Sequence, residues 1–141
     1  MNIKQKSDLL FGLSNENKML TILRKHFDSK SIKKTIDKYN PYDYIDKKNK
    51  IMIELKSRRI RKLKYPDTMI GINKIEEGFK HIENGYKVFL CWSYTDGIGC
   101  YELSKDNYNK DWERMGGRCD RGKDERNMCC FIPTDLMTEI K

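Results

Sequence analysis

The first periodic stretch of the chain extends from Ser7 to Phe27. Ser7, followed by Asp8, is a typical helix N-cap, and apolar residues then recur at steps of three and four along one helical face. The step after Leu13 falls on Glu16, a carboxylate where the pattern calls for an apolar side chain. We therefore predict an amphipathic helix with one acid on its apolar face, which consists of Leu9, Leu13, Leu20, Leu23 and Phe27.

Two strand-like segments follow this helix. Residues 39–46 are rich in tyrosine and residues 50–57 in isoleucine, and the polar sequence Asp-Lys-Lys-Asn at residues 46–49 separates them. Short polar connections of this kind join neighbouring antiparallel strands. The pattern therefore predicts a β-hairpin.

Helical spacing returns in the middle of the chain. Ile72, Ile75, Phe79 and Ile82 repeat at steps of three and four, and Gly85 follows, which suits a left-handed cap just beyond a helix. We predict a second helix over this segment.

The remaining pattern indicates strands and a less regular tail. Residues 87–92 form a short apolar run, typical of a strand covered on both faces, and residues 98–103 return as another strand after a turn at 95–97. A loop-rich segment then leads to a short strand or helix at about residues 131–140. Helix, hairpin, helix, hairpin and mixed tail together predict an α/β fold, or α+β by a stricter definition, with a central mixed sheet flanked by helices.

Length and composition limit the function classes. A chain of 141 residues has room for one domain, which we expect to span residues 1–141. Its 29 Lys+Arg and 21 Asp+Glu give a formal net charge of +8, which favours an anionic partner such as nucleic acid, although solvated lysine faces or an A+T-rich genome would produce similar counts. No apolar run approaches the roughly 20 residues of a membrane span, and the first residues lack the apolar segment of a secretory signal. We expect a soluble, intracellular protein without a membrane partner.

The five cysteines form an odd set without metal-ligand spacing. None lies in a CxxC pair or near a histidine cluster, so we interpret them as reduced structural thiols. They are Cys91, Cys100, Cys119, Cys129 and Cys130.

The predicted hairpin brings candidate chemistry together. Side chains alternate between the faces of a strand, so Glu54 and Lys56 share one face. If Ile45 pairs with Met52, the same register places Asp43 opposite Glu54. Asp46 has the opposite parity, and we expect it to serve the turn instead of the site.

Two facing carboxylates with a lysine beside them suit magnesium and phosphodiester hydrolysis. Carboxylate oxygens are hard ligands that Mg²⁺ prefers, and the Lys56 ammonium would orient the attacking water and favour its deprotonation. Glu16 would join as an extra ligand or an orienting group if its helix faces this site. The alternative for Glu16 is a position at the helix rim, paired with Lys18 or Lys56.

These residues resemble the PD-(D/E)XK nuclease superfamily, the restriction-endonuclease-like fold. Pro41-Tyr42-Asp43 resembles its P-D element, with one residue inserted, and Glu54-Leu55-Lys56 resembles its E-x-K element. Gly12 to Glu16 resembles the helix that carries a further acid, and the order helix, strand, strand, helix, strand matches the shared core. The resemblance covers roughly residues 7–103.

The resemblance implies a metal-dependent nuclease with a defined set of residues. It implies Mg²⁺ or Mn²⁺ as cofactor, and metal ligands from Asp43, Glu54 and the backbone carbonyl of Leu55, with Glu16 as a further candidate. Lys56 is the implied water-activating residue. The implied activity is that of an endonuclease or nickase, with DNA preferred as substrate over RNA, and a homodimer would suit double-strand cutting.

A basic segment follows the E-x-K element. Arg58, Arg59 and Arg61 could neutralise phosphates near the scissile bond without reading sequence. Lys74, near the start of the second predicted helix, could reach the same groove.

Two other function classes remain open at this point. The first is a non-catalytic nucleic-acid-binding module of the same fold within a larger complex. The second is a basic scaffold for acidic partners, in which Asp43 and Glu54 are ordinary surface ion-pair members.

Overall fold

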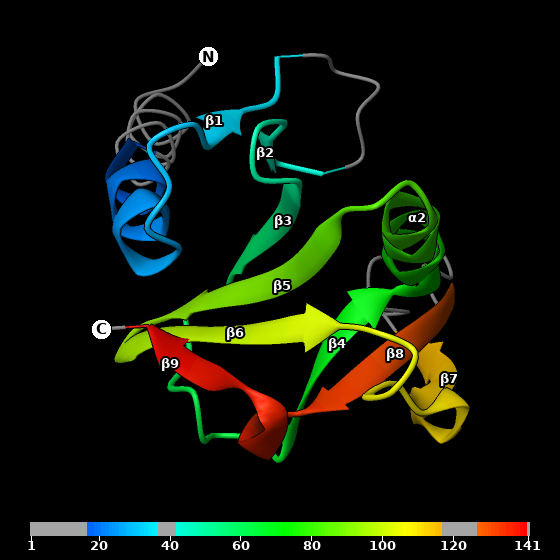
Figure 1. The fold of residues 1–141 in the computed structure, drawn as a ribbon. Coiled ribbons are helices and arrows are strands. Elements are labelled where there is room, and N and C mark those ends of the chain that lie inside the picture. Colours follow the sequence, from blue (N-terminus) through cyan, green and yellow to red (C-terminus); the bar gives the residue numbers. More distant parts are fainter. Residues whose placement is uncertain (1–16, 37–41, 117–126, 141) are drawn as a thin grey trace, which may run out of the picture.

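The computed structural model describes residues 17–36, 42–116 and 127–140. An N-terminal helix, described over residues 17–26, precedes a chain built largely from strands (Figure 1). Its described part confirms the first predicted helix, and Leu23 of the predicted stripe is fully buried. Glu16 lies outside the described residues.

A mixed six-stranded sheet forms the centre of the molecule. Its strand order is β1-β2-β3-β5-β6-β9, and the pairing of β3 with β5 is parallel while the other neighbours are antiparallel. The strands are β1 (Lys33–Lys34), β2 (Tyr44–Asp46), β3 (Ile51–Ser57), β5 (Lys87–Tyr94), β6 (Gly97–Leu103) and β9 (Thr138–Ile140).

A second, three-stranded sheet has the order β4-β8-β7 and lies beside the first (Figure 1). Two short 3₁₀ helices, Lys110–Trp112 and Thr134–Leu136, connect the C-terminal strands. The strands are β4 (Asp67–Gly71), β7 (Glu113–Gly116) and β8 (Asn127–Pro133).

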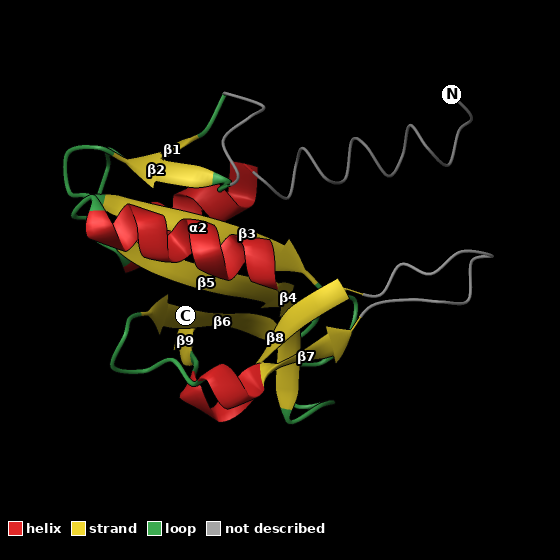
Figure 2. Cartoon of the chain, turned by 90° about the vertical axis from the view of Figure 1, so that its right-hand side faces the viewer, coloured by secondary structure: helices red, strands yellow, loops and turns green. Residues whose placement is uncertain are grey.

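Helices cover the central sheet on opposite faces. Figure 2 shows α2 (Ile72–Glu83) lying across one face of β3 and β5, with the N-terminal helix behind the sheet. The alternation along β3 serves both sides: Met52 packs in the cluster beside α2, whereas Ile51 and Ile53 pack in the cluster beside the N-terminal helix. The mixed sheet and its two helices are those of the expected α/β class.

The hairpin register follows the sequence prediction. Ile45 pairs with Met52 in the antiparallel ladder of β2 and β3. The first strand is shorter than predicted, since β2 begins only at Tyr44 and residues 39–41 lie outside the described residues.

The second helix ends as its sequence predicts. Asn84 is the C-cap of α2 and Gly85 follows with φ +91°, a left-handed conformation that glycine adopts without strain. Gly78, in the middle of the helix, allows a close approach to the sheet, because a Cβ there would lie 2.5 Å from Leu103 Cδ2 and 2.6 Å from the Tyr42 hydroxyl.

The structure adds strands that the hydrophobic pattern did not predict. In chain order, β1 lies between the first helix and the hairpin, and β4 lies between β3 and α2. The described chain therefore contains strands that the predicted core lacks. The tail forms the second sheet with β4, and within it Cys129 and Cys130 are buried with free thiols, as are Cys91 and Cys100 in the central sheet. In the described ranges no helix has the length and apolar character needed to cross a membrane.

Candidate active site

The backbone at Asp43 interrupts the regular ladder between β2 and β3. The first rung pairs Tyr44 with Ile53, and the Asp43 N–H also donates to the Ile53 carbonyl at 3.1 Å, so one extra residue stands opposite Ile53 in a β-bulge. Tyr42 and Tyr44 consequently pack on opposite sides of the sheet although they are two residues apart. Simple alternation, which placed Asp43 directly opposite Glu54, is wrong here because of this bulge.

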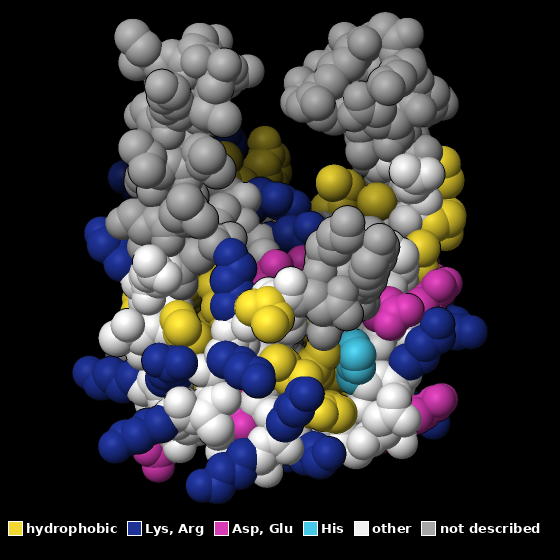
Figure 3. Space-filling model, turned by 90° about the horizontal axis from the view of Figure 1, so that it is seen from above, with side chains coloured by type: hydrophobic (Ala, Val, Ile, Leu, Met, Phe, Trp, Pro, Cys, Tyr) yellow, Lys and Arg dark blue, Asp and Glu magenta, His cyan; other side chains and the backbone are white. Residues whose placement is uncertain are grey.

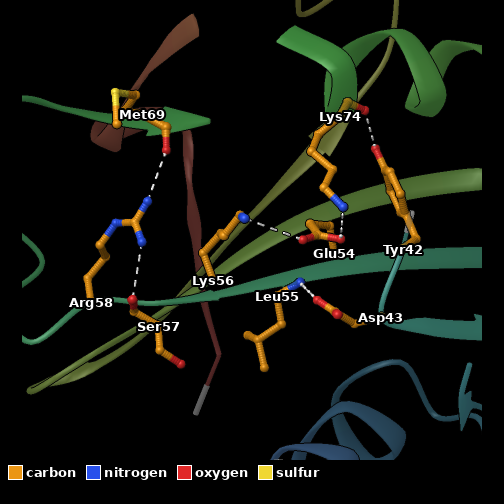
Figure 4. A network of polar contacts seen from close by, with 9 residues as sticks. All are labelled: Tyr42, Asp43, Glu54, Leu55, Lys56, Ser57, Arg58, Met69 and Lys74. Atoms are coloured by element: carbon orange, nitrogen blue, oxygen red, sulfur yellow. Dashed lines mark hydrogen bonds and ion pairs between the residues drawn. The ribbon is translucent and has the colours of Figure 1, made fainter. Parts of the chain in front are cut away.

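The bulge brings the Asp43 carboxylate to the edge of β3. Asp43 Oδ2 accepts a hydrogen bond from the Leu55 N–H at 2.9 Å (Figure 4). The N–H and C=O groups of one strand residue point to the same side, so the Leu55 carbonyl is directed to this edge as well. A carboxylate and a main-chain carbonyl thus lie together where the β2 ladder has ended.

Glu54 is a buried acid between two ammonium groups. The residue is 3% exposed, its Oε1 lies 3.7 Å from Lys56 Nζ, and its Oε2 lies 3.4 Å from Lys74 Nζ (Figure 4). Oε2 is sealed from solvent and has no well-aligned hydrogen-bond donor among the described residues. Lys56 and Lys74 remain partly exposed, with 34% and 20% of their side chains accessible, so both can also reach a bound anion.

The acidity of Glu54 is altered by its surroundings. Burial and then the negative charge of Asp43 raise the pKa of Glu54 to about 7, against the opposing effect of Lys74 and Lys56. The charge of Asp43 thus disfavours the ionised form of Glu54. A cation shared by them would favour the ionised form of both.

Lys74 reaches Glu54 because α2 lies close to the sheet. Lys74 is one helical turn before Gly78, on the same side of the helix. The Tyr42 hydroxyl donates to the Lys74 carbonyl at 2.7 Å and ties this turn to the segment that leads into β2. The sequence had indicated Lys74 only as a cation near the groove, and the hydrophobic pattern gave no sign of the role of Gly78.

Asp46 belongs to a different polar cluster. Its buried carboxylate accepts hydrogen bonds from the hydroxyls of Ser29 and Ser31, and from the backbone N–H groups of Lys48 and Asn49 at 3.1 and 3.0 Å. Burial opposes ionisation, but these hydrogen bonds lower the pKa of Asp46 well below its usual range. The prediction that Asp46 serves the turn is confirmed.

Replacement of Asp46 by alanine is expected to destabilise the protein by about 3 kcal/mol, because the buried Ser29 hydroxyl and three partly buried donors lose their acceptor at once. Urea denaturation followed by circular dichroism measures the change. Glu76→Ala on the exposed side of α2 is the control, with an expected change within about 0.5 kcal/mol. A loss of less than about 1 kcal/mol for Asp46→Ala would contradict this role.

The basic segment after β3 leads away from the two acids. Arg58 donates to the carbonyls of Ser57 at 3.2 Å and Met69 at 3.3 Å, so part of its guanidinium braces β3 against β4. Arg59 and Arg61 are exposed. Figure 3, which views the molecule from above relative to Figure 1, shows many Lys and Arg side chains on the described surface, with fewer acidic side chains among them.

Glu16 is the predicted site residue that lies outside the described residues, as does Pro41 of the P-D element. Within the described ranges, no three His, Cys, Asp or Glu side chains gather closely enough to hold a metal ion. A metal ion held by the described residues would therefore have at most two such side chains among its ligands.

Comparison with known proteins identifies a family. The family model described as "Phage putative PDDEXK endonuclease" matches residues 10–140, which is nearly the whole chain. Neither the curated proteins nor the solved structures contain a match.

Proposed function

Because the chain belongs to the phage PDDEXK endonuclease family, we propose that it is a divalent-metal-dependent nuclease that hydrolyses phosphodiester bonds in DNA. The observation that carries this proposal is the buried Glu54 carboxylate, which interacts with Asp43 and lies within 3.7 Å of two lysine ammonium groups. Keeping a buried carboxylate ionised costs stability. Acids whose pKa is shifted in this way are concentrated at functional sites.

Asp43, Glu54 and the Leu55 carbonyl would hold Mg²⁺ or Mn²⁺. The donor set fits these ions: the oxygens are hard, Glu54 Oε2 lacks an aligned donor among the described residues, and the Leu55 carbonyl is directed to the same edge. Mg²⁺ is commonly held by one or two carboxylates, with water and substrate phosphate as its other ligands. When bound, the ion would supply Lewis acidity and a water of lowered pKa.

Lys56 is the residue that would act on the attacking water. Its ammonium lies beside the buried acid, and about a third of its side chain is exposed to solvent. A phosphate can approach the ammonium from this exposed side. A cation in that position orients a water, favours its deprotonation and offsets the negative charge that develops on the phosphate.

Lys74 has a supporting role in this proposal. It offsets the charge of Glu54 from the helix side, and its exposed part adds positive charge where a phosphate would lie. Glu16 remains a proposed additional acid, to be tested by Glu16→Gln.

Cleavage assays with and without metal test the proposed function. Purified protein is expected to cut plasmid or linear duplex DNA with Mg²⁺ or Mn²⁺, to lose activity in excess chelator, and to regain it when Mg²⁺ is restored. Single-stranded DNA and RNA of the same length test the substrate class. A Glu54→Gln sample purified in parallel controls for contaminating nuclease. Binding without cleavage under all metal conditions would favour the non-catalytic module instead.

A further inference from the structure

The segment that follows β3 presents apolar side chains to solvent among cations. We call residues 58–66 the basic turn; it is the green segment between the ends of β3 and β4 at the lower left of Figure 1. Within it, Leu63 is 79% exposed and Tyr65 is 54% exposed. Burial of such exposed apolar side chains against a ligand is favourable.

The backbone of the basic turn is fixed at several points. Arg58 N–H donates to the Ser93 carbonyl at 2.8 Å, and Thr95 N–H donates to the Ile60 carbonyl at 3.0 Å. Lys62 N–H donates to Asp96 Oδ1 at 2.9 Å. The turn is thus attached to β5 and to the following loop, so the exposed side chains extend from an anchored backbone, which reduces the entropy lost when a ligand binds.

A hollow beside the basic turn combines apolar and cationic lining. Its volume is about 650 Å³, within the range of small-ligand sites, and its lining includes Ile60 and Leu63 together with the cations Arg59, Arg61 and Lys64. Asp96, which accepts the Lys62 N–H, also lines it. Lys64 Nζ also lies 5.6 Å from the centre of the Tyr65 ring. An aromatic face, apolar side chains and ammonium or guanidinium groups therefore meet within one turn.

We propose that the basic turn binds unpaired nucleotides of the substrate, with Leu63 and Tyr65 contacting exposed bases and the neighbouring cations contacting the phosphates. This inference rests on the proposed nuclease function and extends it to a substrate class: duplex DNA with an unpaired segment near the scissile bond. Arg59 is three residues beyond Lys56, so its backbone lies within about 10 Å of the Lys56 backbone. The end of the turn that follows β3 therefore lies near the site.

Base chemistry explains why unpaired nucleotides would be preferred. In a paired duplex the base faces are covered by their neighbours, and only phosphates and groove edges are available to the turn. An unpaired base exposes its face to stacking and apolar contact, which typically changes affinity by about five- to a hundredfold per base. Phosphate contacts are the same for both substrates, so cations alone give no such discrimination.

The test compares two DNA probes in excess chelator, where no cleavage occurs. One is a labelled 20-base-pair duplex, and the other is the same duplex with three unpaired nucleotides at its centre. The wild-type protein is expected to bind the second probe about tenfold more tightly. The double variant Leu63→Ala/Tyr65→Ala is expected to lose this preference and to keep its affinity for the paired duplex within about twofold. Leu136→Ala, which truncates another exposed leucine (47%), is the matched control and should retain the preference.

A charge variant separates the two kinds of contact. Arg59→Ala/Arg61→Ala should weaken binding to both probes equally and reduce the salt dependence of binding by about two phosphate contacts, whereas the Leu63/Tyr65 variant should leave the salt dependence unchanged. Equal affinity of the wild type for both probes, or an unchanged preference in the Leu63/Tyr65 variant, would overturn the role of the turn alone. Failure to bind either probe would overturn the nucleic-acid function as a whole, and this proposal with it.

Discussion

Lys56→Ala is expected to reduce the rate of DNA cleavage by about 10²–10⁴-fold while DNA binding stays within a fewfold of the wild type. The range is that of a lost proton-transfer or water-orienting group. Binding should persist because Arg59, Arg61 and the other exposed cations still contact phosphates. Single-turnover cleavage at saturating protein measures the rate, and a fluorescence-anisotropy titration in chelator measures the affinity.

Lys80→Ala provides the matched control for Lys56. Lys80 is also a lysine in an ion pair, with Glu77 at 3.3 Å, but 68% of its side chain is exposed on α2. Its removal should change cleavage by less than about twofold. Comparable losses of cleavage in the two variants, or a parallel loss of cleavage and binding in Lys56→Ala, would show that Lys56 contributes only charge.

Glu54→Gln is expected to reduce the rate of metal-dependent cleavage by about 10³-fold or more. The same change is expected to stabilise the metal-free protein above neutral pH. Activity falls because the amide cannot replace an anionic metal ligand. Stability rises because the wild type must hold an ionised carboxylate in a buried position, where burial and Asp43 raise the pKa of Glu54 to about 7 from its usual 4.5.

The pH dependence of this stabilisation follows from the direction of the shift. Below pH 4.5 the carboxyl is protonated in both the folded and the unfolded wild type. Between 4.5 and about 7 only the folded state keeps the proton, so the free energy of unfolding falls as pH rises, by roughly 3 kcal/mol in total for this group. Above pH 7 the loss is complete. Urea denaturation in chelator should therefore show that Glu54→Gln is more stable than the wild type at pH 8 and nearly equal to it at pH 4.5. A wild type more stable than Glu54→Gln at pH 8 would contradict a raised pKa of the buried Glu54.

Much of the central hairpin could be predicted from the sequence because its information is local. Period-two alternation set the two faces of β3, and the short polar turn set the register that pairs Ile45 with Met52. The opposite parity of Asp46 correctly assigned that acid to the turn. Helical spacing and Gly85 likewise predicted α2 and its end.

The features that were not predicted depend on contacts between distant segments. The bulge at Asp43 places Tyr42 and Tyr44 in different cores, and alternation within one strand cannot indicate such an extra residue. The ion pair of Lys74 with Glu54 requires the close approach of α2 at Gly78. β4 is short, and its pairing with β8 joins segments about 60 residues apart, so neither segment alone has a distinctive pattern.

The most direct test of the account is the position of a divalent ion. Crystals of the protein grown with Mn²⁺ can be measured for anomalous scattering from the metal. The account predicts a Mn²⁺ peak at about 2.0–2.3 Å from carboxylate oxygens of both Asp43 and Glu54, with the Leu55 carbonyl as a further ligand. A well-occupied Mn²⁺ peak elsewhere, or no peak at these acids at millimolar Mn²⁺ and pH 8, would contradict it.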